Sequence, residues 1–341
     1  MRVLVYQDIS LRHILKANVI NTINIAKGFF QNGCSVDFFA KKETAYFFKD
    51  KLINVQLVFN LSQLNQYQVI YCRGWDFVKR LIKNKFPGVI IIESHEKIDF
   101  PELLTIKKHP RFIFTSISPD INSYYNFSNC QLFPCSIDTD NFSNQEKYNH
   151  NLFHSHDFNI TYCGHMYDYK GIPLILKAAQ QLPHFKFHLV GGKEIDIQRH
   201  QQSNPSKNVI FYGHQDYQDV PNYLYSSDLL LIPYTKQGNK HSASQVTSPI
   251  KLFEYLSTKK PTLCSDIKGI QNWVSENEVT FFKADNLEEF VSKINWIYKN
   301  KDSVDLQKIV EQGYQKSHTY STKNKCAQLL DMVSDLGMYH N

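Results

Sequence analysis

The chain alternates short apolar runs with segments in which apolar residues recur every three or four positions. The runs predict buried strands, and the wider spacing predicts amphipathic helices. In the first half, strands are expected at 2–6, 34–40, 68–72 and 89–92. A helix is expected over 18–31, where Asn32-Gly33 ends it. The chain therefore opens with a β-α-β unit, which is typical of a parallel sheet.

The second half repeats this pattern. Strands are expected at 159–163, 187–190, 209–212 and 229–233, and helices at 173–181, 220–226, 287–298 and about 320–336. Alternating strands and helices in both halves predict an α/β protein. The length of 341 residues fits two domains. Residues 143–157, rich in Asn, His and Ser, are read as the linker between them.

Composition narrows the class of protein. A hydrophobic content of 42% and a charged content of 21% are typical of a soluble globular protein. The seven cysteines are scattered, without paired or metal-like spacing, which favours a reduced cytoplasmic protein over a secreted disulfide scaffold. No apolar run approaches the roughly 20 residues that span a bilayer, and Gln7-Asp8 interrupts the start too early for a signal peptide.

Charge is distributed unevenly. The 18 Lys and Arg of residues 1–150 exceed the 13 Asp and Glu there, a net +5, whereas the remainder carries +1 of the total +6. This excess points to an acidic partner, either phosphate groups or an anionic membrane surface. Nucleic acid is the weaker reading, because no helix-turn-helix, zinc or RNA-binding signature accompanies the charge.

A basic segment at 77–86 makes the membrane alternative specific. It reads as a helix with apolar residues on one side and Lys79, Arg80 and Lys83 on or beside the other. Further positive charge in this half comes from Lys41, Lys42, Lys107, Lys108 and Arg111. The first reading is a core-packed helix with a solvated basic face. The alternative is peripheral contact with the inner face of a membrane through these residues.

The segment 248–272 has the pattern that most resembles a ligand site. Ser248 is a plausible N-cap and Pro249 suits the first helical position. Lys251 and Glu254 then lie one turn apart on a shared face. A helix N-terminus suits a phosphate, and a carboxylate one turn further in can accept two hydrogen bonds from a ribose diol. The alternative is an N-capped surface helix with an ordinary Lys/Glu pair.

Polar turns follow several predicted strands. Glu93-Ser94-His95-Glu96 follows the strand at 89–92, and ligands of open α/β sheets sit beyond the carboxyl ends of strands. The turn 164–171 follows the strand at 159–163 and precedes a helix, a layout that brings backbone near a phosphate. Lys170 is positioned there to supply a point charge. A lone histidine in a loop is usually a solvated side chain without a function, and this is the alternative for His95.

These motifs together resemble family-four retaining glycosyltransferases, which have the GT-B fold of two facing Rossmann-like domains with parallel sheets and an interdomain cleft. The resemblance rests on Ser-Pro-x-Lys-x-x-Glu-Tyr from Ser248, followed by Lys-Pro, Ser-Asp and Lys-Gly. It implies that His95, Lys170 and Glu254 are catalytic, with His95 reaching the donor's sugar and diphosphate and Glu254 binding its ribose. It implies donor binding by Gly164, His165, Lys170, Gly191, Gly192, Gly213, Ser248, Pro249, Ile250, Lys251 and Glu254.

The chain departs from the family pattern at several positions. Many members carry an acid where Val246 stands, and an arginine where His165 stands. The glycine pair that normally follows the first strand is missing, and Lys16 lies nearest to it. Cys135-Ser136 replaces the Asn-Gly of a segment that closes the first domain. The sugar-facing end of the nucleotide motif is therefore less well matched than its nucleotide-facing end.

The resemblance also implies a domain plan and an activity. Residues 1–150 would bind the acceptor, 151–318 the nucleotide sugar, and 319–341 would form a helix crossing back to the first domain. The expected reaction moves a sugar, with retention, from a nucleotide-diphosphate sugar to a glycan, lipid-linked or protein acceptor in cell-surface polysaccharide or glycolipid synthesis. Neither a cofactor nor a metal is expected. A non-catalytic nucleotide-sugar-binding subunit and a GT-B sugar-nucleotide epimerase remain open as alternatives.

Overall fold

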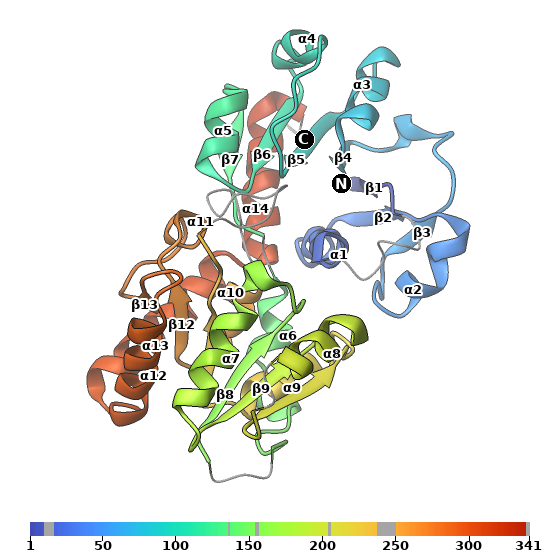
Figure 1. Ribbon diagram of the computed structural model, residues 1–341. Coiled ribbons are helices and arrows are strands. Elements are labelled where there is room, and N and C mark those ends of the chain that lie inside the picture. Colours follow the sequence, from blue (N-terminus) through green and yellow to red (C-terminus); the bar gives the residue numbers. More distant parts are fainter. Residues whose placement is uncertain (10–16, 136, 154–156, 204–205, 237–249, 339–341) are drawn as a thin grey trace. The chain divides into compact units, whose positions relative to one another are not determined.

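The computed structural model describes residues 1–9, 17–135, 137–153, 157–203, 206–236 and 250–338. The chain divides into two compact units. Unit 1 comprises Met1–Asp138 and Tyr320–Asn341, and unit 2 comprises Thr139–Thr319. Each unit is built around a parallel β-sheet covered by helices (Figure 1).

The sheet of unit 1 has seven parallel strands in the order β3-β2-β1-β4-β5-β6-β7. The strands are β1 (Arg2–Gln7), β2 (Ser35–Phe39), β3 (Gln56–Val58), β4 (Val69–Arg73), β5 (Val89–Ser94), β6 (Phe112–Ser116) and β7 (Cys130–Leu132). The helices are α1 (Ala17–Gln31), α2 (Ala45–Lys49), α3 (Trp75–Lys83), α4 (Leu103–Lys107), α5 (Pro119–Tyr125) and α14 (Thr322–Val333), with shorter turns η2 (Lys42–Thr44), η3 (Leu64–Gln66) and η6 (Ser334–Met338). All six positions of β5 are buried, as its unbroken apolar run predicts for a strand covered on both faces.

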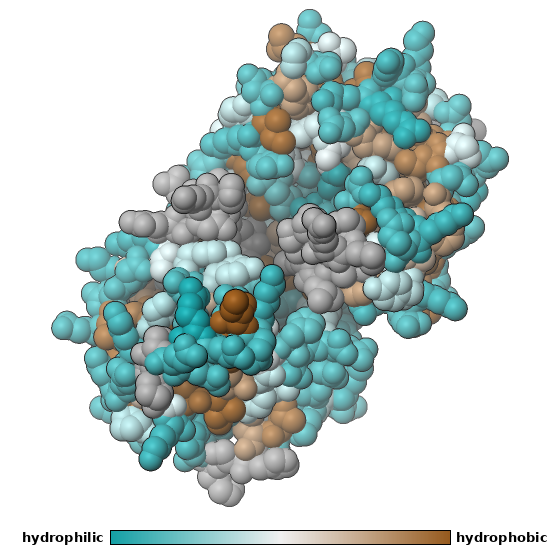
Figure 2. All heavy atoms as spheres, turned by 45° about the vertical axis from the view of Figure 1, so that its right-hand side comes forward, coloured by the Kyte–Doolittle hydropathy of each residue, from teal (hydrophilic) through white to brown (hydrophobic). Residues whose placement is uncertain are grey.

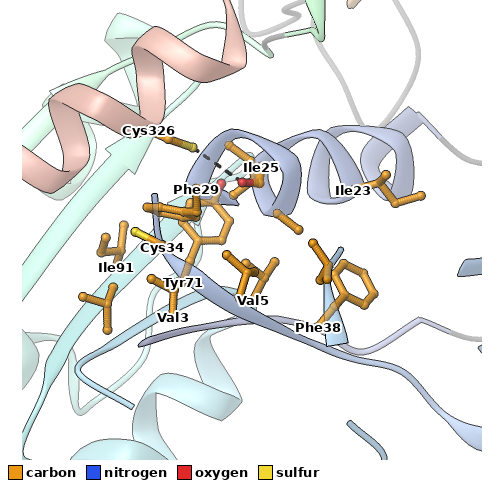
Figure 3. Close-up of a cluster of buried hydrophobic side chains, with 14 of the residues drawn as sticks. Val3, Val5, Ile23, Ile25, Phe29, Cys34, Phe38, Tyr71, Ile91 and Cys326 are labelled. Carbon is orange, nitrogen blue, oxygen red and sulfur yellow. Dashed lines mark hydrogen bonds between the residues drawn. The ribbon is translucent and has the colours of Figure 1, made fainter. Parts of the chain in front are cut away.

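Helices α1 and α14 pack side by side on one face of this sheet. Figure 3 shows Ile25 and Phe29 of α1 directed toward the strands, with the Cys326 thiol of α14 donating to the Ile25 carbonyl at 3.5 Å. The two helices approach closely at Gly28, where a Cβ would lie 2.8 Å from the side chains of Cys326 and Thr322. Glycine therefore permits the tight contact between these helices.

An aromatic cluster fills the other face of the unit 1 sheet. Trp75 of α3 stacks on Phe112 and Phe114 of β6, with ring centroids 6.4 and 6.1 Å away. Tyr125 and Phe127 complete the cluster. Since both faces are buried, the functional groups of this unit are concentrated at the strand ends.

The sheet of unit 2 has six parallel strands in the order β10-β9-β8-β11-β12-β13. They are β8 (Asn159–Cys163), β9 (Lys186–Val190), β10 (Val209–Gly213), β11 (Leu229–Ile232), β12 (Thr262–Ser265) and β13 (Thr280–Phe282). The helices are α6 (Thr139–Ser143), α7 (Ile172–Gln181), α8 (Glu194–Ser203), α9 (Val220–Tyr225), α10 (Ile250–Leu256), α11 (Lys268–Gln271), α12 (Leu287–Lys299) and α13 (Val304–Thr319), with 3-10 turns η4 (Gln145–Lys147) and η5 (Asp168–Lys170).

Strand order reverses between β8 and β11, because the chain first builds the sheet outward through β9 and β10 and then returns. In such sheets the crevice outside the carboxyl ends of the two central strands is where ligands bind. Unit 1 follows the same plan, with its reversal between β1 and β4.

The predicted α/β architecture with parallel sheets is confirmed. Within the described ranges, no helix is long and apolar enough to cross a membrane. On the face drawn in Figure 2, hydrophilic side chains dominate and hydrophobic ones form separate groups.

Candidate active site

Three glycines line the carboxyl edge of the unit 2 sheet. The Gly164 N–H donates to the Val190 carbonyl at 2.8 Å, and the Gly191 N–H donates to the Gly213 carbonyl at 2.7 Å. Gly191 has a φ of +104°, and a Cβ there would lie 2.5 Å from the Gly164 carbonyl oxygen. Gly191 therefore leaves no room for a side chain, and the turns after β8 and β9 pack closely against each other.

Two lysines converge beside these turns. The Lys251 Nζ atom, from α10, lies 3.9 Å from the ring centroid of Tyr162 and 5.6 Å from that of Tyr234. The Lys170 Nζ atom, at the end of η5, lies 3.8 Å from the Tyr234 centroid. Both ammonium groups are therefore held over aromatic faces, which attract cations. Because Tyr162 lies in β8 and Tyr234 follows β11, this cluster occupies the switch point of the sheet.

Neither ammonium forms a direct ion pair with a carboxylate among the described residues. The Lys251 Nζ atom is buried and finds no hydrogen-bond acceptor there. Burial, with the charge of Lys170 acting in the same direction, lowers the pKa of Lys251 to about 7, against the opposing effects of Cys163 and Glu254. Burial also lowers the pKa of Lys170 to about 8. An anion contacting both groups would reverse these shifts, so the cluster has the properties of an anion-binding site.

Glu254 lies one turn after Lys251 on α10 and is 7% exposed. Its Oε1 atom accepts a hydrogen bond of 2.7 Å from the Tyr217 hydroxyl. Burial raises the pKa of the carboxyl to about 7, although that hydrogen bond and Lys251 act in the opposite direction. The hydroxyl of Tyr255 accepts from the Cys163 N–H at 2.8 Å, which fixes α10 to the end of β8. The helix therefore presents Lys251 and Glu254 at a set distance from the glycine edge.

His165 follows Gly164 and stacks on Tyr167, with ring centroids 5.1 Å apart. Its pKa is lowered, first by partial burial of the ring and then by the charges of Lys251 and Lys170, although the residue as a whole is exposed. We therefore expect a neutral imidazole at pH 7. It does not supply the positive charge of the arginine that the resemblance would place here.

The remaining sequence-predicted residues of this unit fall into two groups. Gly192 follows Gly191 in the turn after β9, Gly213 ends β10, and Ile250 is buried as the first residue of α10. Ser248, Pro249 and Val246 lie outside the described residues, as do Lys16 and Ser136.

A second polar cluster lies in unit 1 at the end of β5. Its centre is Glu93, whose Oε1 atom lies 2.8 Å from Asn21 Nδ2 and 2.6 Å from His95 Nε2. The Oε2 atom accepts from the Tyr71 hydroxyl at 2.7 Å and from the ammonium of Lys325 on α14. Both Glu93 and Lys325 are buried, at 2% and 1% exposure. The structure therefore places His95 against a buried ion pair.

The charges of this cluster determine its protonation. Burial acts to raise the pKa of Glu93, but Lys325, His95 and Arg73 together hold it well below its usual range. Burial and the charge of Arg73 lower the pKa of His95 to about 4, against the opposing effect of Glu93. At neutral pH the cluster thus contains an ionised glutamate and a neutral histidine, and the His95 side chain keeps 25% of its surface exposed.

Sequence reasoning missed several participants, among them Tyr162, Tyr234 and Lys325. Tyr162 reads as an ordinary strand residue and Tyr234 as the start of a loop. Their only signal is that they lie at or just after the carboxyl ends of adjacent strands. Lys325 reads as a polar position of a surface helix. Its signal is that it precedes Cys326 on the buried side of α14. Within the described ranges, no group of His, Cys, Asp and Glu is arranged to hold a metal ion.

Comparison with known proteins finds a family model that matches part of the chain. Residues 157–300, which contain the Gly164–Glu254 cluster, match the family model described as Glycosyl transferases group 1. No curated protein sequence matches the chain.

Solved structures resemble the whole chain at low sequence identity. A glycosyltransferase from Rickettsia africae ESF-5 is 13% identical with a TM-score of 0.76, over 98% of each chain. HepE from Anabaena, solved in complex with UDP, is 14% identical with a TM-score of 0.72, over 98% of this chain and 99% of its own. Sucrose-phosphate synthase from Thermosynechococcus elongatus is 13% identical with a TM-score of 0.65, over 98% of each chain. These likenesses establish the GT-B fold.

Proposed function

We propose that this chain, whose residues 157–300 match the glycosyl transferases group 1 model, is a retaining glycosyltransferase that uses a nucleotide-diphosphate sugar. The observation that carries the proposal is the pair of lysines, Lys170 and Lys251, held over Tyr234 without a direct ion pair to a carboxylate among the described residues. A nucleotide diphosphate supplies the missing negative charge at the switch point, where such sheets bind nucleotides.

The proposed chemistry follows from these charges. Departure of the nucleotide diphosphate from the sugar builds negative charge on the phosphate oxygens. Lys170 and Lys251 are already in place, and a buried, preorganised cation stabilises developing charge better than one in water. Glu254, when ionised, accepts hydrogen bonds from the ribose diol, and Tyr217 holds its carboxylate in position.

The finer parts of the proposal concern the acceptor and the setting. We propose a glycan, lipid-linked or protein acceptor and transfer with retention. We propose no metal or cofactor, because the lysines neutralise the diphosphate charge that a metal would otherwise neutralise. The role would be in cell-surface polysaccharide synthesis from the cytoplasmic side, with contact to the inner membrane face through the basic residues of unit 1. HepE was solved with UDP and with UDP-glucose, so uridine donors are the first to test.

The test is a transfer assay with a panel of nucleotide sugars, in which release of the nucleoside diphosphate is measured with and without a chelator. We expect release with at least one donor, no effect of chelation, and retention of the anomeric configuration in the product. Lys170→Ala should lose activity, whereas Lys177→Met, an exposed lysine on α7, should keep it. Loss of activity on chelation that a divalent cation restores would contradict the metal-independent proposal.

A nucleotide-sugar-binding subunit is the second candidate, and one observation favours it. His165, expected to be neutral, adds no positive charge at a position where the family carries arginine. Such a subunit would bind a nucleotide sugar without releasing diphosphate in the presence of any acceptor. An epimerase would instead convert the sugar, which analysis of the recovered sugar would reveal.

A further inference from the structure

The carboxylate of Glu93 is surrounded by hydrogen-bond donors. Asn21 and His95 meet its Oε1 atom, and Tyr71 and Lys325 meet Oε2. The charged and titratable groups around it are Tyr71 and Arg73 of β4, His95 on its own segment, and Lys325 and Cys326 of α14. Lys325 and Arg73 carry positive charge, so the carboxylate remains ionised and can only accept hydrogen bonds.

This ionisation determines which nitrogen of His95 carries the proton. The Nε2 atom lies 2.6 Å from Glu93 Oε1. Since an ionised carboxylate has no proton to donate, Nε2 must be the donor. A neutral imidazole with its proton on Nε2 has a bare Nδ1, which is a hydrogen-bond acceptor. His95 then suits a hydroxyl group, which can donate to it, and not a phosphate oxygen.

The buried ion pair is poorly explained by stability alone. Replacing a buried ion pair with apolar residues of similar volume is often neutral or stabilising, because desolvation offsets the attraction. Lys325 reaches Glu93 across 232 positions of the sequence, from a helix anchored by its own contacts. The Ser321 side chain caps α14, and the Thr322 N–H donates to the Ile137 carbonyl at 2.9 Å. Lys325 is therefore held against Glu93 by helix α14, whose N-terminus is itself fixed by these hydrogen bonds.

We propose that Lys325 is a positioning residue that, through Glu93, fixes the tautomer and orientation of His95, so that Nδ1 accepts a hydrogen bond from a sugar hydroxyl. The identity of the ligand as a sugar rests on the proposed function. The tautomer of His95 and its dependence on Glu93 and Lys325 rest on the unit 1 geometry alone.

The direct test is 15N NMR of the full chain with 15N-labelled histidine, because protonated and bare imidazole nitrogens have well-separated chemical shifts. The His95 signals are assigned as those missing from His95→Gln. At pH 7 we expect a neutral ring with its proton on Nε2. A protonated ring, or a neutral ring with its proton on Nδ1, overturns the proposal.

Glu93→Gln gives the sharpest contrast. Lys325 can only donate, so the amide oxygen of the new side chain must face it. The amide nitrogen then faces His95 and donates to Nε2. We expect the ring proton to move to Nδ1, and retention of the Nε2 proton would refute the role assigned to Glu93.

Variants of Lys325 test the other end of the chain of contacts. Lys325→Met should leave Glu93 prone to protonation and mix the two tautomers of His95, whereas Lys325→Arg should keep the parent tautomer. Lys323→Met changes an exposed lysine of the same helix and is the matched control. A parent-like spectrum for Lys325→Met removes Lys325 from the proposal. If that variant does not fold, the Lys325→Arg and Glu93→Gln spectra still decide it.

The activity arm uses the donor found in the transfer assay. Glu93→Gln and Lys325→Met should lower kcat by about 10- to 100-fold, the effect of leaving the sugar hydroxyl without its acceptor, with little change for Lys323→Met. If no donor is ever turned over, the proposed function fails while the NMR result still stands. If the tautomers respond as expected but kcat does not, the positioning role is refuted.

Discussion

Replacing Lys251 with methionine should stabilise the protein while removing its ability to bind the donor. Burial lowers the pKa of Lys251 from 10.5 to about 7, so the folded state releases a proton that the unfolded state keeps. The sign follows from linkage: Lys251 destabilises the fold fully below pH 7, and this penalty fades as pH rises toward 10.5. Methionine has a similar length, no charge, and a thioether that packs well against aromatic rings.

The size of the gain can be worked from the site. A shift from 10.5 to about 7 corresponds to about 5 kcal/mol in favour of the neutral form. The contact of Nζ with the Tyr162 ring, at 3.9 Å, returns about 2 kcal/mol to the charged form. Relaxation around a buried charge reduces the remainder. We expect Lys251→Met to raise the free energy of unfolding by about 1–3 kcal/mol at pH 6.5.

Urea unfolding followed by circular dichroism measures this, at pH 6.5 and again at pH 9.5. The gain should be present at the lower pH and mostly gone at the higher one, and Lys177→Met should show neither. Isothermal titration with the donor or its nucleoside diphosphate should show about 100-fold weaker binding for Lys251→Met. A variant that is less stable at pH 6.5, or equally stabilised at both pH values, would refute the reasoning about the buried charge.

Three further predictions follow from the same residues and from unit 1. Lys170→Ala should lower kcat by about tenfold or more and change the donor KM much less, because the charge of Lys170 acts most strongly on the departing diphosphate. Steady-state kinetics that show a large change in KM with little change in kcat would contradict this. Lys251 and Glu254 both titrate near pH 7 with opposite effects on donor affinity, so the contribution of Glu254 is the difference between the parent and Glu254→Gln. That variant should bind the donor about tenfold more weakly than the parent at pH 8, and the difference should shrink as pH drops through about 7, where Glu254 gains its proton; calorimetry across pH 6–8 checks it. Cosedimentation with anionic vesicles should fall with salt and with Lys79, Arg80 and Lys83 changed together to Ser. The loss of binding free energy should be about 1 kcal/mol per charge or less, since Lys79 already pairs with a carboxylate of its own helix. No binding at low salt would favour an acceptor away from membranes.

Local pattern predicted most of the central strands. The expected strand at 159–163 coincides with β8, because five consecutive buried residues end at a glycine. The helix expected at 77–86 instead spans Trp75–Lys83. It begins after Gly74, whose φ of +118° marks the turn but whose lack of a side chain leaves no capping signal. Helix α8 and strand β13 were not predicted, since the first is largely polar and the second has three residues.

The candidate site was only partly readable for a different reason. Lys251 and Glu254 are one helical turn apart, so spacing alone placed them together. The aromatic rings beside Lys251 belong to β8 and to the turn after β11, and Glu93 contacts Lys325, which is 232 positions away in the sequence. Nothing near Glu93 in the sequence indicates a buried cation. Long-range pairings of this kind depend on how the sheet and helices assemble, which local periodicity does not encode.

The place of α14 in unit 1 has a consequence for the order in which the protein is made. A ribosome synthesises the strands of unit 1 first, then all of unit 2, and only then the helix that covers part of the first sheet. Domains of a nascent chain usually complete from the N-terminal end. Here the first unit must wait, with the α1 face uncovered and Glu93 lacking Lys325, until translation has passed residue 325. A nascent chain stalled after unit 2 would therefore expose an apolar surface on its earliest-made part, where a chaperone would be expected to bind.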